Sequence, residues 1–191
     1  NPDNDDDRAY KSVEMGYSNY KLNNRDAAIE AYKKALEYRP NYGTAYRGLG
    51  NVYYDNSEDA DALKYFELAM QYDEENSKAY YYTLGWLYND IEEYENAEKI
   101  LLKAVDYDPQ SQKSFEELAY TYLKLEQFND GVTAAKKAIE INKEASLGYH
   151  YLGNCYMGLG QKDKAMEAYN KLKAFDEDEA KLLLDEINDA E

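Results

Sequence analysis

The sequence predicts an all-α protein built as an array of helix-turn-helix units, and two observations support this. Only three prolines and ten glycines occur in 191 residues, and 32% of the residues are charged, a composition that favours helices. The chain also aligns on itself with successive spacings of 34, 35, 34 and 34 residues. A period of about 34 residues indicates stacked helical hairpins. The five predicted units are 9–42, 43–77, 78–111, 112–145 and 146–179.

The first helix of each unit is predicted from an apolar stripe that contains one small residue. A glycine or alanine in this position leaves room for a closely packed neighbouring helix. A large apolar residue precedes it in every unit, which gives the spacing of an amphipathic helix. The small residues are Gly16, Gly50, Gly85, Ala119 and Gly153, and the preceding residues are Met15, Leu49, Leu84, Leu118 and Leu152.

The second helix of each unit repeats the same logic. A small residue recurs at Ala28, Ala62, Ala97, Gly131 and Ala165, and four residues later stand Tyr32, Phe66, Leu101, Ala135 and Tyr169. The turn between the helices carries common turn formers, such as Asn23 and Gly160. The fourth unit departs furthest from the pattern at Gly131 and Ala135, so we expect its packing to be locally softer or differently twisted.

The two ends of the array carry different predictions. Residues 1–8 are acidic with nothing apolar to bury, so we expect a disordered lead-in. Residues 180–191 place Ala180, Leu183, Leu184 and Ile187 on one face and acids elsewhere, which predicts a C-terminal capping helix. The sequence begins at Asn1 without a methionine, so it is either a mature form or a piece of a longer chain.

Composition excludes several classes of partner and of chemistry. A formal charge of −17 repels phosphate backbones and anionic membrane surfaces. No apolar stretch approaches the ~20 residues that span a bilayer, so we expect a soluble chain, cytoplasmic by default, with an exported mature form left open. The single cysteine, Cys155, stands at an apolar helical position that favours a buried, inert thiol.

Residues for catalysis, metal binding or cofactor binding are scarce. The chain has one histidine, His150, no cysteine–histidine cluster and no glycine-rich phosphate loop. The acidic runs at residues 3–7 and 73–76 lack the spacing and the glycine of a calcium loop. We therefore predict no enzyme activity, no metal and no cofactor.

The repeated residues resemble the tetratricopeptide repeat family over residues 9–179. Phrases such as AYRGLGNVYYD (45–55) and YLGNCYMGLGQKDKAMEAY (151–169) carry the resemblance. It implies a right-handed superhelical solenoid of five antiparallel helix pairs, with a concave groove lined mainly by the first helices. It also implies that ligand-facing residues occupy places 2, 5, 6, 9, 12 and 13 of a unit.

These places supply the predicted partner-binding residues, which are mainly aromatic with scattered polar groups. Trp86, the sole tryptophan, is the first candidate, with Tyr82 one turn before it. For each tyrosine the alternative is packing between adjacent repeats. The predicted residues are Tyr17, Tyr20, Arg47, Asn51, Tyr54, Tyr82, Trp86, Asn89, Tyr120, His150 and Asn154.

The leading functional hypothesis is a protein-interaction scaffold that takes a peptide or helical segment of a neutral to basic partner. The alternatives are a regulatory or targeting module cut from a larger enzyme, sensor or secretion protein, and self-association of the chain. A clamp for chaperone C-terminal carboxylates, known in some family members, is disfavoured. Glu117 stands where that clamp has its final arginine, and its charge would repel a carboxylate.

Overall fold

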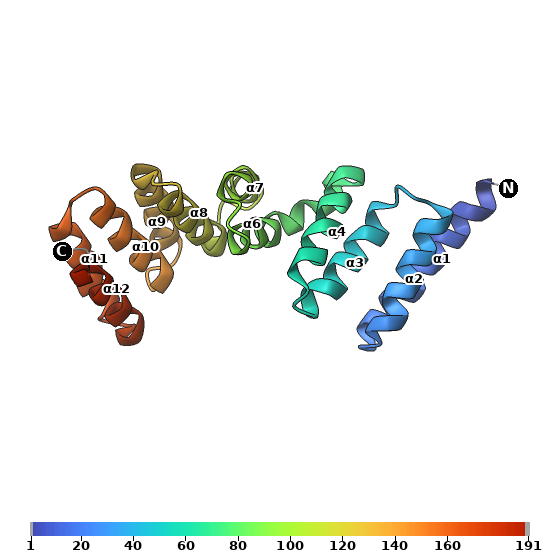
Figure 1. The fold of residues 1–191 in the computed structure, drawn as a ribbon, viewed down its shortest axis with the longest axis horizontal. Helices are drawn as coiled ribbons and strands as arrows, with labels where there is room; N and C mark the ends of the chain where they lie inside the picture. The colour runs from blue at the N-terminus through green and yellow to red at the C-terminus, as the bar shows by residue number, and fades with distance from the viewer. Residues whose placement is uncertain (1, 190–191) are drawn as a thin grey trace. The chain divides into compact units, whose positions relative to one another are not determined.

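The computed structural model describes residues 2–189, and every regular element in that range is a helix (Figure 1). The chain divides into two compact units, an N-terminal unit up to Tyr80 and a C-terminal unit from Tyr81. Within residues 2–189, no helix combines the length and the hydrophobicity needed to cross a bilayer.

The N-terminal unit consists of two antiparallel helix pairs followed by two short helices. Helix α1 packs on α2, α2 on α3 and α3 on α4. The core between the pairs includes Tyr32, Leu49 and Val52, each at most 3% exposed. The helices are α1 Pro2–Lys21, α2 Arg25–Tyr38, α3 Gly43–Asp55, α4 Asp59–Tyr72 and α5 Glu74–Ser77, and the 3-10 helix η1 spans Lys78–Tyr80.

The C-terminal unit contains three helix pairs and one closing helix. Each first helix packs on the second helix of its own repeat, and α7 and α9 pack on the repeat that follows. The helices are α6 Tyr81–Asp90, α7 Tyr94–Tyr107, α8 Gln112–Lys124, α9 Phe128–Ile141, α10 Ser146–Gly158, α11 Lys162–Leu172 and α12 Glu177–Asp189.

The recurring glycines of the first helices lie against large side chains. A Cβ atom at Gly16 or Gly50 would lie 2.7 Å from the ring of Tyr32 or Phe66, respectively. At Gly85 it would lie 2.4 Å from Leu101. Any side chain at these positions would force the helices apart, so the prediction of close helix contact at the small residue is confirmed.

The fourth repeat packs its helices closely with different residue types at the recurring positions. Ala119 and Ala135 stand at the positions that are glycine and a large side chain elsewhere, and both are fully buried. A Cβ atom at Gly131 would lie 2.5 Å from Sγ of Cys155 on α10. The glycine of this repeat therefore makes room for the next repeat's cysteine, which is buried as predicted.

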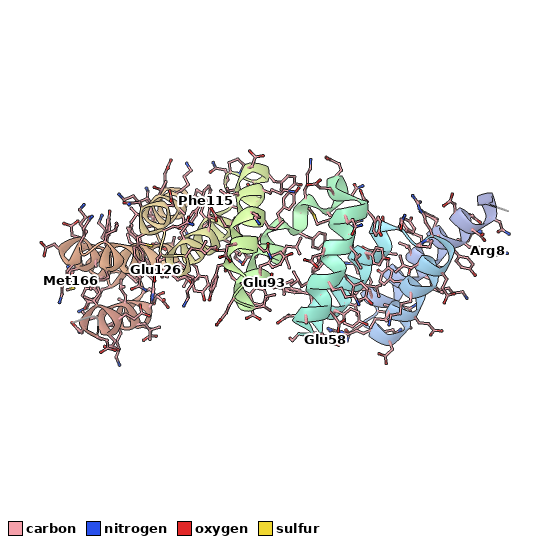
Figure 2. The ribbon with its side chains drawn as sticks, turned by 45° about the horizontal axis from the view of Figure 1, so that its top comes forward. Arg8, Glu58, Glu93, Phe115, Glu126 and Met166 are labelled. Carbon is pink, nitrogen blue, oxygen red and sulfur yellow. The ribbon has the colours of Figure 1, made fainter. Side chains whose placement is uncertain are left out.

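One residue of every turn between first and second helices adopts left-handed backbone. Only one of the five is glycine, although a non-glycine residue is strained in this region. Glu126, labelled in Figure 2, stands two residues before the start of α9. The five residues and their φ angles are Asn23 (58°), Ser57 (59°), Glu92 (62°), Glu126 (58°) and Gly160 (68°).

The acidic lead-in is helical, which corrects the prediction of a disordered segment. Helix α1 begins at Pro2, a residue suited to the first helical position. The acids that follow lie near the positive end of the helix dipole, and Asp5 and Asp7 pair with Arg8 (3.4 Å) and Lys11 (2.6 Å). The remaining predicted residues, Asn1 of the lead-in and 190–191 of the capping helix, lie outside the described residues.

The closing helix α12 packs against both α10 and α11. It begins at Glu177, three residues before the predicted start. Leu183 and Ile187 are fully buried, and a Cβ atom at Gly153 would lie 2.7 Å from Leu183. At Gly153 the large neighbouring side chain therefore comes from α12, whereas at Gly16, Gly50 and Gly85 it comes from the second helix of the same repeat.

Candidate functional site

In the N-terminal unit, predicted partner-binding residues connect successive repeats. The Tyr20 hydroxyl on α1 donates a hydrogen bond to Oδ2 of Asp55 on α3 at 2.7 Å. Burial and then this carboxylate raise the pKa of Tyr20 to about 12. Asn51 Nδ2 donates to the Tyr80 hydroxyl at 3.0 Å, and Arg47 Nη1 donates to the Asn76 carbonyl at 3.1 Å.

Two predicted tyrosines of this unit stay accessible. Tyr17 is 52% exposed, and the Lys21 ammonium lies 5.3 Å from the centre of its ring. Tyr54 is 38% exposed near the end of α3. These two rings are the parts of the predicted N-terminal site that a partner can reach most directly.

In the C-terminal unit, three predicted residues line one cavity of about 170 Å³, here called the Trp86 pocket. Trp86 and Asn89 come from α6 and Tyr120 from α8, so the repeat spacing brings them together as the first-helix positions suggest. Tyr82, half-buried one turn before Trp86, is outside this lining. The complete lining is Trp86, Asn89, Asp90, Glu117, Tyr120 and Tyr151.

Hydrogen bonds fix two polar residues in the lining of the Trp86 pocket, Asn89 and Glu117. Asn89 is 4% exposed, and its Nδ2 donates to Oε2 of Glu117 at 3.0 Å. Its Oδ1 accepts a hydrogen bond from the buried Thr121 hydroxyl at 2.9 Å. Asn89 is therefore engaged on both sides of its amide, and it holds the Glu117 carboxylate in place beside the aromatic rings.

The aromatic walls come from neighbouring first helices. The rings of Tyr120 and Tyr151 are tilted to each other with centroids 5.6 Å apart. Tyr94 of the second helix α7, outside the lining, meets Tyr120 edge-on at 6.3 Å. The Lys124 ammonium lies 5.3 Å from the centre of the Tyr120 ring. Such ring pairs limit side-chain freedom, so the pocket is largely preformed.

The electrostatic environment of the pocket is negative. Burial, and then the neighbouring Glu116, raise the pKa of Glu117 above its usual value, against the lowering effect of the Asn89 hydrogen bond. Burial raises the pKa of the Tyr151 hydroxyl, and the Glu117 carboxylate adds to that rise. Glu116 itself accepts a hydrogen bond from the backbone N–H of Gly148 at 3.2 Å, which caps α10.

The structure buries the predicted groove residue His150 under α12. It is 7% exposed; Nδ1 lies 2.6 Å from Oε1 of Glu179, without hydrogen-bond alignment, and Nε2 lies 2.9 Å from Oε2 of Glu186. Asn154 Nδ2 donates to the same Glu186 oxygen at 2.7 Å. These side chains attach the closing helix, so His150 is not available as a direct partner contact.

Three pocket residues, Asp90, Glu117 and Tyr151, are not among the predicted partner-binding residues. The repeat register places Glu117 and Tyr151 at ligand-facing positions, although the predicted set omits them. Asp90 was missed, although it too stands at a ligand-facing place, because an acid on a helix is usually a solvated surface residue.

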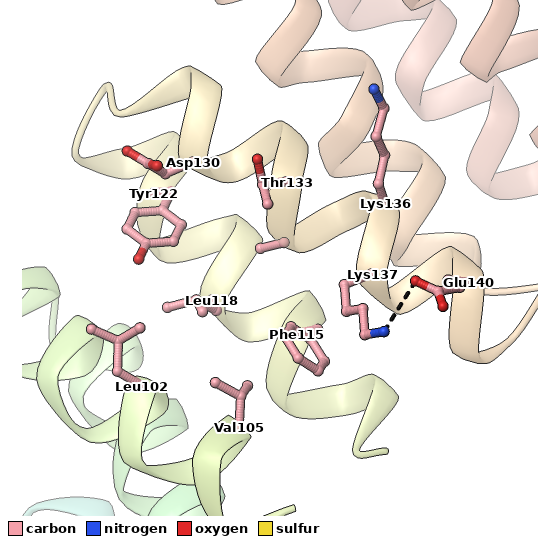
Figure 3. A pocket seen from close by; sticks show the side chains of 11 residues that line it. Leu102, Val105, Phe115, Leu118, Tyr122, Asp130, Thr133, Lys136, Lys137 and Glu140 are labelled. Atoms are coloured by element: carbon pink, nitrogen blue, oxygen red, sulfur yellow. Dashed lines mark hydrogen bonds and ion pairs between the residues drawn. The ribbon is translucent and has the colours of Figure 1, made fainter. Parts of the chain in front are cut away.

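A larger apolar cleft of about 500 Å³ lies between α7, α8 and α9 of the C-terminal unit (Figure 3). Leu102 and Val105 of α7 face Leu118 and Phe115 of α8, as Figure 3 shows. Charged residues of α9 form its rim, including Lys137, which pairs with Glu140 at 3.0 Å. No predicted site residue lines this cleft.

The helical hairpins and their preformed first-helix pocket define a repeat-built interaction scaffold. Tetratricopeptide repeat models match residues 13–79, 79–111, 113–144 and 146–179. The chain therefore belongs to the tetratricopeptide repeat family, as the sequence resemblance indicated. Because this repeat is a non-catalytic interaction module, the predictions of an interaction scaffold and of no enzyme activity are confirmed.

Solved structures share the fold over most of the chain. The MamA protein is 26% identical, with a TM-score of 0.78 over 91% of this chain and 94% of that one. YrrB, described as a TPR protein with an unusual peptide-binding site, is 22% identical, with a TM-score of 0.83 over 88% of each chain. MamA of Desulfovibrio magneticus RS-1 is 18% identical, with a TM-score of 0.76 over 90% and 96%. No curated protein sequence matches the chain.

Proposed function

We propose that the chain binds an extended or helical peptide segment of a partner protein on the first-helix face of its C-terminal unit, centred on the Trp86 pocket. The observation that carries this proposal is the lining of the pocket, to which three successive first helices contribute Trp86, Tyr120 and Tyr151. Tryptophan and tyrosine dominate interface hot spots because they bury large areas with little loss of rotamer entropy.

The polar contacts support the same proposal. Asn89 holds Glu117, and Glu116 caps α10, so the backbone around the pocket is fixed before a ligand arrives. A preformed site loses less entropy on binding. The net charge of −17 favours a neutral or basic partner segment. The fold shared with YrrB, which is described as having a peptide-binding site, agrees with a peptide ligand.

The test is selection of peptides from a phage-displayed random library against the immobilised chain, followed by calorimetric titration of the enriched peptides. Trp86→Ala should weaken binding by about 2 kcal/mol, roughly thirtyfold, because a central aromatic anchor is lost. Circular dichroism checks that the variant keeps its helices.

Leu102→Ala is the matched control, since Leu102 is 45% exposed and lines the other cleft. It should leave peptide affinity unchanged. Loss of binding in Leu102→Ala with retention in Trp86→Ala would move the site to the α7–α8–α9 cleft. Absence of any enriched peptide would overturn the proposed function.

A further inference from the structure

The Trp86 pocket combines aromatic rings with carboxylates in a small volume. At about 170 Å³ it is smaller than the ~300–1,000 Å³ of ordinary small-molecule sites, so it accommodates one side chain of a ligand. Trp86, Tyr120 and Tyr151 supply aromatic rings, and Asp90 and Glu117 supply negative charge. Ring faces and carboxylates both attract cations, and in a partly desolvated site each attraction is strengthened.

We propose that the Trp86 pocket is a receptor for the guanidinium group of an arginine in the bound peptide. This inference rests on the proposed function and names the residue that the pocket selects. The guanidinium would lie against the ring of Trp86 or Tyr151 and donate hydrogen bonds to the Glu117 carboxylate, with Asp90 at the more exposed edge.

The arrangement of Glu117 favours such a ligand. Its Oε2 accepts the hydrogen bond of Asn89 at 3.0 Å, which orients the carboxylate. Burial raises the pKa of Glu117, so the ionised carboxylate is poorly solvated in the free protein. A bound cation would compensate that charge, because an opposite charge at short range favours the ionised form.

Arginine fits these surroundings better than lysine. Its planar guanidinium stacks on aromatic rings and pairs with a carboxylate through two parallel N–H groups. A lysine ammonium is strongly hydrated and loses more solvation on entering a pocket with only two carboxylates. The Lys124 ammonium already lies 5.3 Å from the centre of the Tyr120 ring, and its positive charge disfavours a second cation there. The guanidinium is therefore assigned to the ring of Trp86 or Tyr151.

The chain's single tryptophan lies in the pocket, so its fluorescence reports occupancy directly. The probes are capped peptides Ala-Ala-Arg-Ala-Ala, together with versions that carry citrulline or lysine in place of arginine, titrated at constant ionic strength. Citrulline has almost the shape of arginine without the charge. We expect a saturable change with the arginine peptide and about tenfold weaker binding of the other two.

Glu117→Gln should weaken the arginine peptide by about tenfold. Glu167→Gln, which removes an exposed carboxylate of α11 and the same net charge, should leave its affinity unchanged. Equal binding of the citrulline peptide, equal effects of the two variants, or no fluorescence change would overturn the proposal. Equal binding of the lysine peptide would overturn the assignment to arginine.

The outcomes also separate this inference from the proposed function. Library peptides that depend on Trp86 but carry no arginine would leave peptide binding in place and refute the arginine receptor. Enriched peptides with one invariant arginine, whose replacement by citrulline abolishes the Trp86 signal, would support both.

Discussion

Nδ2 of Asn89 donates a hydrogen bond to Oε2 of Glu117, 3.0 Å away on the next first helix. This contact joins the third repeat to the fourth and also fixes an acid beside the Trp86 pocket. A buried carboxylate with a raised pKa is unfavourable for the free protein when it is ionised. The same residue thus connects stability with ligand recognition.

The first prediction follows from the raised pKa of Glu117. In the folded protein, Glu117 takes up a proton at a pH where the same carboxyl in the unfolded chain is still ionised. The ionised Glu117 carboxylate therefore reduces the stability of the fold above the folded-state pKa. The reduction shrinks as the pH falls below the folded-state pKa, and it is gone below the pKa of the unfolded chain. We therefore expect Glu117→Gln, which keeps an acceptor for Asn89, to raise the melting temperature near about pH 7.5.

The measurement is thermal unfolding by circular dichroism at several pH values, with Glu167→Gln as the control. The gain from Glu117→Gln should shrink towards about pH 4.5, where glutamates protonate. A gain that is independent of pH would contradict the assignment of the effect to ionisation. A pH-dependent gain in stability, together with the expected loss of arginine-peptide binding, would show that ionised Glu117 serves binding at a cost in stability.

The second prediction concerns the contact between Gly85 and Leu101. Gly85→Ala should destabilise the chain by about 1–3 kcal/mol, because its Cβ atom would lie 2.4 Å from the fully buried Leu101. Leu101→Ala alone should cost about 2–5 kcal/mol. The fourth repeat has alanine at both equivalent positions, so the double variant should be no less stable than Leu101→Ala. Urea unfolding of all four proteins measures this, and strict additivity would show that the two residues do not compete for space.

The third prediction compares substitutions at two turns that share the left-handed backbone conformation. Glu126 and Gly160 both have φ near the left-handed region, at 58° and 68°. Gly160→Ala should cost about 1 kcal/mol by backbone strain alone, since nothing lies within 4 Å of the added Cβ atom. Glu126→Gly should change stability in the opposite direction by a smaller amount, and destabilisation by Glu126→Gly would show that its side chain outweighs the strain.

Much of this fold could be predicted from the sequence because similar residue types recur at the same positions of each repeat. The glycines at 16, 50 and 85 and the large residues 16 positions later follow from one register, and the structure confirms their packing. The lead-in was predicted wrongly because its lack of apolar residues was given more weight than its proline and its acids at a helix start.

The candidate site was less predictable, because repeat register shows which face a residue occupies but not what covers it. Asn89 and His150 stand on the expected face, yet both are buried by groups about 30 residues further along the chain. Whether such a residue meets solvent depends on the side chains of the following helix. Pairings such as His150 with Glu179 vary from repeat to repeat, so no period reveals them.

The fourth prediction concerns the attachment of α12. His150 lies between the carboxylates of Glu179 and Glu186, and Asn154 also donates to Glu186. His150→Ala leaves both acids without this partner and opens space next to the packed face of α12. We expect a loss of about 1–3 kcal/mol, concentrated at the C-terminal end. Hydrogen exchange should show amides of α12 losing protection before those of α8, with Asp185→Asn, an exposed position on α12, as the unchanged control. Uniform loss of protection along the chain would mean that His150 stabilises the whole unit.

The fifth prediction uses Cys155 to report on the packing of the fourth and fifth repeats. The thiol is fully buried, and burial raises its pKa to about 12, so almost none is present as the reactive thiolate at neutral pH. Ellman's reagent should therefore modify the native chain only as fast as the structure opens around α10.

Gly131→Ala would place a methyl group 2.5 Å from Sγ of Cys155. It should speed the reaction at least tenfold by favouring the open state, about 1.4 kcal/mol or more. Gly160→Ala, whose added methyl meets nothing, should give a smaller acceleration that matches its effect on stability. Rapid modification of the native wild-type chain would show that the junction between α9 and α10 opens more readily than its close packing implies.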